Sequence, residues 1–239
     1  MKFLNSLYRE TFFKIAGALF FIVYILYRID LRIREYQHHP QLFTLFAHIN
    51  WSLIMLTFLL YFISYLIRKP PIARALTLTE RFFPPFCASL SYLIYESPGW
   101  SHWSRIQNIP FLKNIFTPFY PFDMGHPHIL SVILLIAGNT ILAIGLYYLK
   151  TCFSIVIQAR GLIQNGIYRY IRHPLYIGQT LTTIGSCLWI PSWFNIFLTL
   201  LFIPLQRYRA YLEEKKLTSV FPNYQEYKKK TGAYFPKMF

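Results

Sequence analysis

The chain has 239 residues, of which 55% are hydrophobic and 20% aromatic, whereas only 14% are charged, against about 25% in an ordinary soluble domain. This composition excludes a soluble domain and indicates a membrane protein. The formal net charge of +15 would point to nucleic acid in a soluble protein, but here the basic residues gather at the ends of apolar segments and form no separate basic domain. We therefore expect an integral membrane protein with no nucleic-acid partner.

Apolar segments recur along the first two thirds of the chain. Residues 11–27 follow several basic residues, as in a signal peptide, but no small-residue cleavage site comes after them, so a retained transmembrane helix is predicted. Residues 42–67 and 128–149 contain no Lys, Arg, Asp or Glu and exceed the roughly 20 residues that span a bilayer as a helix. Residues 82–95 form a weaker segment, which Pro84-Pro85 is expected to kink or make re-entrant.

The last apolar stretch, residues 174–206, is too long for a single helix across a membrane. Its 33 residues would make a helix of about 50 Å, whereas the hydrocarbon core is about 30 Å thick. Pro191-Ser192-Trp193-Phe194-Asn195 lies at its middle and is typical of a turn. The stretch is therefore predicted to be a tight helical hairpin.

The distribution of Lys and Arg predicts the orientation. Residues 150–173 carry four Lys and Arg residues and no acid, and the tail from Arg207 onward carries eight, so both belong in the cytosol. The predicted fold is an all-α, polytopic transmembrane bundle with about six membrane passages and both termini cytosolic. One connection is an exception, because Arg28, Arg32 and Arg34 would face outward, partly balanced by Asp30 and Glu35.

The chain divides by content into two regions. Residues 1–127 are predicted to hold N-terminal transmembrane helices and loops, and residues 128–239 a C-terminal core with a cytosolic basic tail. Polar clusters at the ends of apolar segments concentrate in the second region. We expect the chemistry to lie there.

The first polar cluster leads directly into the hairpin. Pro174 suits the first turn of a helix, which places Arg172 and His173 at the mouth of the bundle, where free backbone amides favour an anionic group. Gly178 would allow a ligand or another backbone to approach closely. The alternative interpretation is that Arg172 is a positive-inside anchor, His173 a helix cap, and the neighbouring tyrosines members of an interfacial belt.

The second polar cluster follows the hairpin. Arg209 and Glu213 lie four residues apart and share one helix face, with Glu214 beside them. Taken alone, this is an exposed ion pair worth well under about 1 kcal/mol. A hairpin, however, returns its second end beside its first, so Arg172, His173, Glu213 and Glu214 are predicted to converge at one membrane depth.

These clusters resemble the isoprenylcysteine carboxyl methyltransferases and phospholipid methyltransferases, small membrane enzymes that use S-adenosylmethionine. Their shared signature is Arg-His-Pro-x-Tyr-x-Gly, a hydrophobic hairpin, and then Arg-x-x-x-Glu-Glu-x-x-Leu. Residues 172–178 and 209–217 match it in full and in order, whereas Phe-Pro-Asn-Tyr at 221–224 departs from the usual glycine and is one residue shorter. The resemblance covers about residues 128–236, and the N-terminal half has no such match.

The resemblance implies a set of cofactor-binding residues. They are Tyr168, Arg172, His173, Tyr176 and Gly178, with Glu213 or Glu214 holding the ribose or amino group of S-adenosylmethionine. The residues that act on the acceptor would be Arg172 or Arg209, which could orient a carboxylate, and Glu214 or His173, which could take a proton from an amine.

The methyl acceptor stays open at this stage. A prenylated cysteine carboxylate, a phospholipid amine and a small thiol are all candidates, and the residues that select among them are expected in the N-terminal half. Two other functions compete: a membrane reductase that uses NADPH, by analogy with the sterol reductases, and a non-enzymatic protein whose basic tail binds anionic lipid.

Other polar residues are given structural roles. His38-His39, His126 and His128 lack the acidic or cysteine companions of a metal site, so no metal is expected, and the three cysteines are interpreted as packing residues. Asn139 is expected to make a contact between helices, as are His48 and Asn50, where Gly138 and Gly145 allow close packing.

Overall fold

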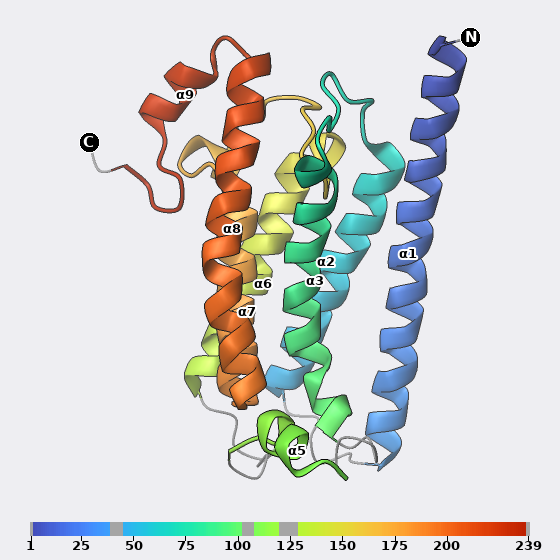
Figure 1. Ribbon diagram of the computed structural model, residues 1–239, viewed down its shortest axis with the longest axis vertical. Coiled ribbons are helices and arrows are strands. Elements are labelled where there is room, and N and C mark those ends of the chain that lie inside the picture. Colours follow the sequence, from blue (N-terminus) through green and yellow to red (C-terminus); the bar gives the residue numbers. More distant parts are fainter. Residues whose placement is uncertain (1, 39–44, 102–107, 120–128, 238–239) are drawn as a thin grey trace.

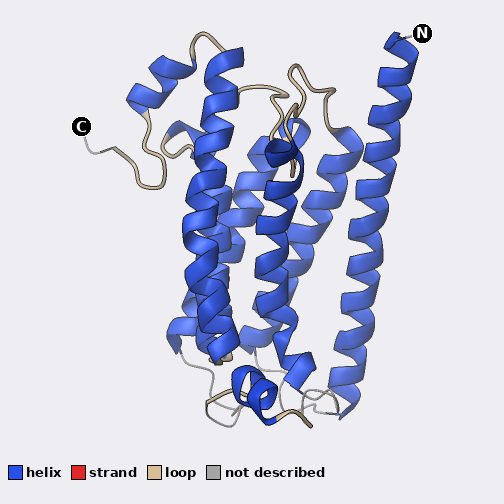
Figure 2. Ribbon diagram, viewed as in Figure 1, coloured by secondary structure: helices blue, strands red, loops and turns tan. Residues whose placement is uncertain are grey.

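The fold of the protein, seen in a computed structural model, is a bundle of long helices that lie side by side (Figure 1). The structure describes residues 2–38, 45–101, 108–119 and 129–237. In these ranges all secondary-structure elements longer than an isolated bridge are helices (Figure 2). The long helices are α1 (Lys2–His38), α2 (Leu45–Ile67), α3 (Leu78–Ser101), α6 (Ile129–Leu149), α7 (Pro174–Trp189) and α8 (Trp193–Val220). The predicted all-α class is confirmed.

Short elements cap the two ends of this bundle. Helix α5 (Pro110–Phe116) lies at one end, and the two 3-10 turns η2 (Lys150–Cys152) and η3 (Gly166–Arg169) lie toward the other, together with α9 (Tyr224–Lys230) (Figure 1). The start of α1 and the C-terminal end of the described chain also lie toward this second end (Figure 1).

Three of the described helices are long and apolar enough to cross a membrane. They comprise residues Glu10–His38, Leu45–Ile67 and Ile129–Cys152. Helix α7 has 16 residues and is about 24 Å long, shorter than the roughly 30 Å hydrocarbon core. The count of six membrane passages therefore stays a prediction.

Helix α1 extends well beyond the predicted 11–27. Arg32 and Arg34 lie on its last turns and not in a connection, and each pairs with an acid three or four residues away: Arg34 Nε lies 2.9 Å from Asp30 and Arg32 Nη1 3.9 Å from Glu35. Such spacings stabilise a helix, which explains why the charged segment continues α1.

Helix α3 continues through Pro84-Pro85, so the prolines do not end it, and whether it is kinked or re-entrant stays a prediction. Because Pro84 has no N–H, the carbonyl of Glu80 loses its helical donor, and it accepts instead from the backbone N–H of Ile157 at 3.1 Å. Pro84 itself is fully buried. The proline therefore fastens the loop between η2 and η3 to α3.

The predicted hairpin is confirmed by α7 and α8. Helix α7 ends at Trp189, and α8 begins at Trp193 after a three-residue turn. The hydroxyl of Ser192 accepts from the backbone N–H of Asn195 at 3.2 Å, and the Asn195 side chain donates to the carbonyl of Ile190 at 2.8 Å. These bonds satisfy groups that the two helix ends would otherwise leave unpaired.

Helices α6 and α7 approach each other closely because glycines face one another. A Cβ atom added to Gly178 would lie 2.8 Å from the carbonyl oxygen of Gly138 and 2.7 Å from Leu142, and one added to Gly145 would lie 2.8 Å from Leu175. Of the two roles expected for Gly178, the structure shows the backbone approach. Small residues are the usual means of such contacts in membranes.

Polar side chains add specific bonds to this packing. Asn139 of α6 donates to Asn50 of α2 at 3.1 Å, as expected for a contact between helices, and the Ser131 hydroxyl donates to the carbonyl of Gly185 in α7 at 2.7 Å. Cys87 and Cys187 are buried free thiols. The contact of Asn139 with Asn50 is the one expected from the sequence, and the burial of Cys87 and Cys187 agrees with their interpretation as packing residues.

A buried ion cluster joins segments that are distant in sequence. The carboxylate of Glu10 in α1 lies 2.9 Å from Arg68, just after α2, and 2.8 Å from Arg160 in the loop before η3. All three side chains are at most 11% exposed. This cluster was not predicted from the sequence, and it fixes α1 and the loop to the end of α2.

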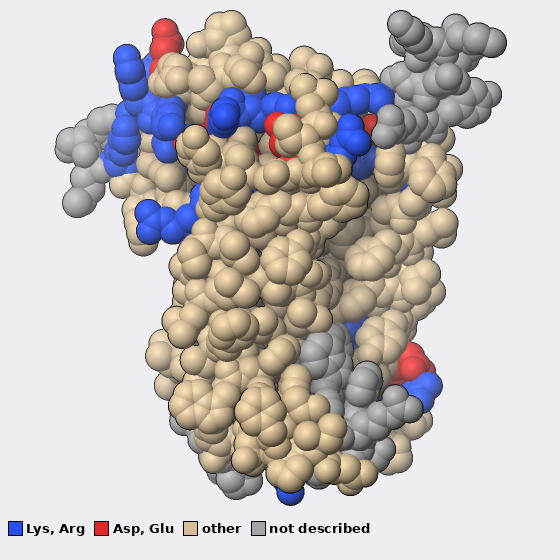
Figure 3. Space-filling model, viewed as in Figure 1, with Lys and Arg blue, Asp and Glu red and all other residues tan. Residues whose placement is uncertain are grey.

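Charged residues gather at one end of the bundle (Figure 3). Lys and Arg concentrate at the end where α9 lies, while a broad middle band of the visible face is almost free of charge. This is the distribution that a membrane-embedded bundle requires, with charges in the aqueous region and apolar side chains facing lipid.

We expect Gly178→Ala to destabilise the protein by about 1–3 kcal/mol, because the added methyl group would press on the backbone of α6 and overpacked interiors cost that much. Thermal unfolding in detergent, followed by intrinsic fluorescence, measures the change. Ile133→Ala, at an exposed position of α6, is the control with little expected effect. Unchanged stability of the Gly178 variant would contradict the packing role.

Candidate functional site

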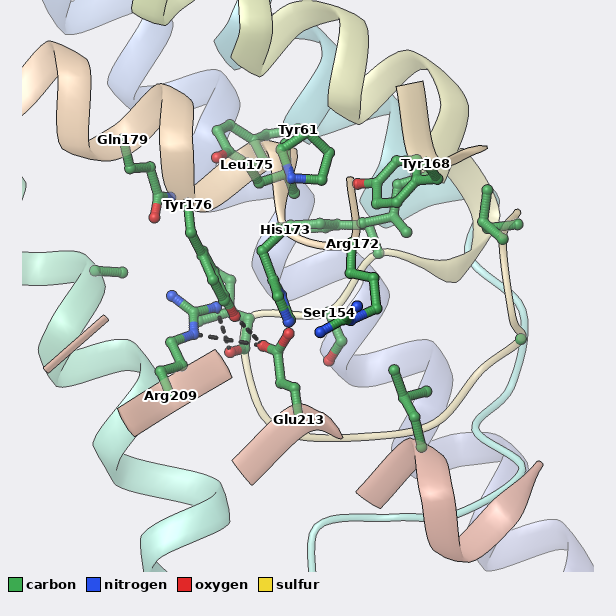
Figure 4. Close-up of a pocket in the computed structure, with 18 of the residues that line it drawn as sticks. Tyr61, Ser154, Tyr168, Arg172, His173, Leu175, Tyr176, Gln179, Arg209 and Glu213 are labelled. Atoms are coloured by element: carbon green, nitrogen blue, oxygen red, sulfur yellow. Dashed lines mark hydrogen bonds and ion pairs between the residues drawn. The ribbon is translucent and has the colours of Figure 1, made fainter. Parts of the chain in front are cut away.

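A cavity of about 160 Å³ lies at the charged end of the bundle, between the helix ends and the loop that joins η2 to α7. Its walls come from α1, α2, α3, α6, α7, α8 and α9 as well as from this loop, and Figure 4 shows part of them. The two polar clusters of the sequence, which are separated by the hairpin, therefore meet around one cavity.

Most of the predicted site residues line this cavity. These are Tyr168, Arg172, His173, Tyr176, Arg209 and Glu213. Glu214 lies next to them, bonded to Arg172 and His173. Gly178 is not among the lining residues, because it faces α6.

Glu214 is the centre of the first contact group. Its Oε1 lies 2.8 Å from Nε of Arg172 and 3.1 Å from Nε2 of His173, and its Oε2 lies 2.7 Å from Nζ of Lys228 in α9. Burial alone would raise the pKa of Glu214, but hydrogen bonds from His173, Lys228 and Arg172 outweigh it and hold the pKa well below its ordinary value. The carboxylate is ionised at neutral pH and fully engaged.

Glu213 belongs to a second contact group, one residue away on α8. The Tyr176 hydroxyl donates to Glu213 Oε1, and Nε of Arg209 lies 3.5 Å from the same oxygen. In Figure 4 the three side chains point toward one another at the edge of the cavity. Glu213 is 26% exposed in its side chain, against 12% for Glu214, so one carboxylate is open to the cavity and the other is enclosed.

Arg209 is a buried cation with unused donors. It is 4% exposed, its guanidinium lies 5.0 Å from the centre of the Tyr176 ring, and Nη2 donates to the carbonyl of Ile155 at 3.1 Å. Within the described part of the chain, its Nη1 has no hydrogen-bond partner. An unpaired buried donor is costly, so this nitrogen is suited to an acceptor group of a ligand.

His173 is positioned by aromatic rings as well as by Glu214. Its imidazole stacks on the Tyr176 ring, with centroids 5.2 Å apart and planes 4° apart, and the Tyr234 ring lies 5.9 Å away on a tilted plane. Pro174 begins α7 directly after it, as the sequence predicted, although the His173 side chain does not cap the helix.

Three further tyrosines enclose the loop side of the site. Burial raises the pKa of Tyr168 well above its ordinary value, so its hydroxyl stays protonated and donates to the carbonyl of Gly145 at 3.4 Å. Tyr224 and Tyr227 of α9 are buried, and Tyr227 donates to the carbonyl of Tyr168 at 2.6 Å. Tyr224 and Tyr227 were not predicted as site residues, although their spacing of three on a short helix was a usable signal.

The inner end of the cavity is formed by the N-terminal helices. Phe21 of α1, Tyr61 of α2 and Tyr92 of α3 line it, together with Gln179 of α7. The side chain of Gln179 bonds to Tyr61 and accepts from Gln206 of α8. This end is mainly aromatic and carries no carboxylate among its lining residues, in contrast to the loop end.

Residues 127–224 match the phospholipid methyltransferase family. This part of the chain is a phospholipid methyltransferase domain. No curated protein matches the chain.

The phospholipid methyltransferase domain contains the complete hairpin and both polar clusters. It begins just before α6 and ends at Tyr224, the first residue of α9. The resemblance seen in the sequence is thus confirmed, and with the apolar helices the domain indicates an integral membrane methyltransferase. Residues 1–126 and the segment after Tyr224 lie outside the match.

The described residues of this protein include no group of three or more His, Cys, Asp and Glu side chains that could hold a metal ion. His39, His126 and His128, which the sequence analysis weighed as metal ligands, lie outside the described residues.

Glu214→Gln should lower the unfolding free energy by about 2 kcal/mol at pH 7, because Arg172 and His173 lose their charged acceptor. The folded-state pKa of Glu214 lies below the unfolded value of about 4.3, so its contribution is complete above that pH and is lost as the pH falls toward the folded pKa. Chemical denaturation between pH 7 and pH 3 measures it.

The difference between the wild type and the Glu214 variant should therefore shrink below about pH 4. Glu226→Gln, at an exposed position of α9, is the matched control. A difference that stays constant over the whole pH range would refute the ionised, bonded state of Glu214.

Proposed function

We propose that this protein is an S-adenosylmethionine-dependent methyltransferase that modifies a lipophilic acceptor at the membrane surface. The observation that carries the proposal is the cavity inside the phospholipid methyltransferase domain, where Glu213, Arg209, Tyr176 and His173 surround one space. Neither polar cluster could form this site without the hairpin between them.

The residues at the loop end fit the proposed cofactor. Glu213 offers a carboxylate for ribose hydroxyls or the amino group, and the rings of Tyr168 and Tyr176 offer faces that attract a cationic sulfonium. Glu214 is engaged by Arg172, His173 and Lys228, so of the two glutamates Glu213 is proposed to contact the cofactor. When bound, S-adenosylmethionine would supply the electrophilic methyl group.

The protein residues would contribute alignment and the exclusion of water. Methyl transfer is an in-line displacement, and such reactions depend on holding the reactants in position and away from solvent. The stacked His173 and Tyr176 rings, with Tyr176 bonded to Glu213, give the loop end a rigid wall. We propose Gly178 as a packing residue that allows α7 to lie against α6, and not as a cofactor contact.

Arg209 is the better candidate to orient the acceptor. The Arg172 side chain already donates to Glu214 and to the carbonyls of Lys228 and Thr231, whereas Arg209 keeps a buried, unpaired Nη1 at the cavity. A carboxylate with a strongly lowered pKa is a poor general base, so Glu214 is proposed to position Arg172 and His173. An acceptor that is already anionic would need no base.

The lipid chain of the acceptor is proposed to lie at the inner end of the cavity. Helix α3 packs on α7 and α8, while α1 and α2 pack on each other and α2 also on α6. Aromatic rings fill the space between α3 and the first two helices: the centroid of the Tyr92 ring lies 5.4 Å from that of Tyr24 and 5.9 Å from that of Phe58. An apolar chain could enter sideways from the membrane between α3 and the first two helices, with the charged end of the bundle and both termini in the cytosol.

Calorimetry of the purified protein should detect S-adenosylmethionine binding, and Glu213→Gln should weaken it at least tenfold through the loss of a charged hydrogen-bond acceptor. Thermal shift with NADPH is the parallel test for a reductase. Glu226→Gln is the control and should bind normally. Stabilisation by NADPH alone, without any S-adenosylmethionine binding, would overturn the proposed activity.

Labelled methyl donor with membrane lipid extracts, analysed by mass spectrometry, should identify a methylated lipid-linked product. We expect Arg209→Gln to reduce kcat/KM for that acceptor by a factor of about 100, as loss of a charged hydrogen bond would, and to affect the acceptor more than the cofactor. Tyr92→Ala should instead alter the preference among acceptor chains. An Arg209 variant with normal acceptor kinetics would exclude its orienting role.

A further inference from the structure

The chain segment after α9 returns to the start of α7. Residues Thr231, Gly232, Ala233 and Tyr234, here called the strap, run beside residues 170–173. The backbone N–H groups of Arg172 and His173 donate to the carbonyls of Gly232 and Ala233 at 2.9 and 3.0 Å, and the Gly232 N–H donates back to Tyr170 at 3.2 Å. The pairing forms a parallel bridge between Ile171 and Gly232.

The strap therefore holds the main chain of two residues of the methyltransferase motif. Pro174 follows them and has no N–H, and the His173 carbonyl already accepts from Tyr176 and Ile177. Without the strap, the two donors of Arg172 and His173 would lose their protein partners at a partly enclosed site, where unpaired backbone groups are unfavourable.

Side chains extend this attachment. Arg172 donates through Nη1 to the carbonyl of Thr231, and the Thr231 hydroxyl donates to the Tyr227 carbonyl at 2.7 Å. Thr231 is 2% exposed. The Tyr234 ring lies 5.9 Å from His173, beside the stack that His173 makes with Tyr176. The strap thus contacts Arg172 and His173 through both backbone and side chains.

Gly232 is required for the shape of the strap. A Cβ atom at this position would lie 1.6 Å from the carbonyl oxygen of Phe235, which is backbone and has no freedom to rotate away. Any other residue must therefore open the turn after Gly232. A single methyl group is enough to displace the strap.

We propose that the strap is a positioning element of the cofactor site, which holds Arg172 and His173 in the orientation that binds S-adenosylmethionine. The inference rests on the proposed function but concerns residues beyond the family match, which ends at Tyr224. The main chain of Arg172 and His173 is therefore held by a segment outside the matched residues 127–224.

The test uses the full-length protein in detergent and the variant Gly232→Ala. Hydrogen exchange of the amides of Arg172 and His173, followed by mass spectrometry, reports whether the strap has been released. Calorimetry gives the affinity for S-adenosylmethionine, and steady-state methyl transfer separates KM from kcat. Phe235→Ala is the matched control, because this neighbouring side chain is 82% exposed.

We expect Gly232→Ala to accelerate exchange of both amides and to raise the cofactor Kd and KM at least tenfold, with a smaller change in kcat and a melting temperature within a few degrees of the wild type. Faster exchange with unchanged affinity would overturn the proposal. A second variant, with residues 231–239 deleted, should reproduce the loss of affinity.

Unfolding of both variants would assign the strap to the stability of the bundle and also overturn the positioning role. Absence of cofactor binding by the unmodified protein is a different result, because it refutes the proposed function itself. The wild-type titration thus separates the two failures.

Discussion

The carboxylate of Glu214 joins three parts of the protein that are far apart in sequence. It bonds to Arg172 and His173 before α7 and to Lys228 in α9, while its own position on α8 depends on the return of the hairpin. Buried charges of this kind are tolerated only when they are fully paired. The loop, the hairpin and the tail must therefore be assembled together, and the cavity exists only when they are.

Much of this arrangement could be predicted because it follows from length and spacing. The apolar stretch 174–206 is too long for one passage, and its turn sequence leads to α7 and α8, which brings Arg172 and Glu214 together. Local rules could not reveal the Glu10 cluster with Arg68 and Arg160, because its members are separated by long stretches of sequence. Nor could they reveal that the helical bond lost at Pro84 in α3 is replaced by one from a distant loop.

The same limits apply to individual roles in the site. Glu213 and Glu214 are adjacent and chemically identical, so sequence alone left both as cofactor ligands. Their surroundings separate them: one carboxylate is enclosed by cations, and the other faces the cavity beside Tyr176 and Arg209. The two arginines divide in the same way, since Nε and Nη1 of Arg172 donate to protein acceptors, whereas the buried Nη1 of Arg209 has no partner among the described residues.

The proline in α3 has a consequence for how this site tolerates change. A regular helix uses almost all of its carbonyls internally and offers few main-chain acceptors to other segments. At Pro84 the carbonyl of Glu80 is released and accepts from the N–H of Ile157, so this one attachment of the loop between η2 and η3 to α3 is made by main chain alone. The side chain at position 157 can then change without breaking this bond, whereas Arg160 of the same loop is attached through its side chain to Glu10.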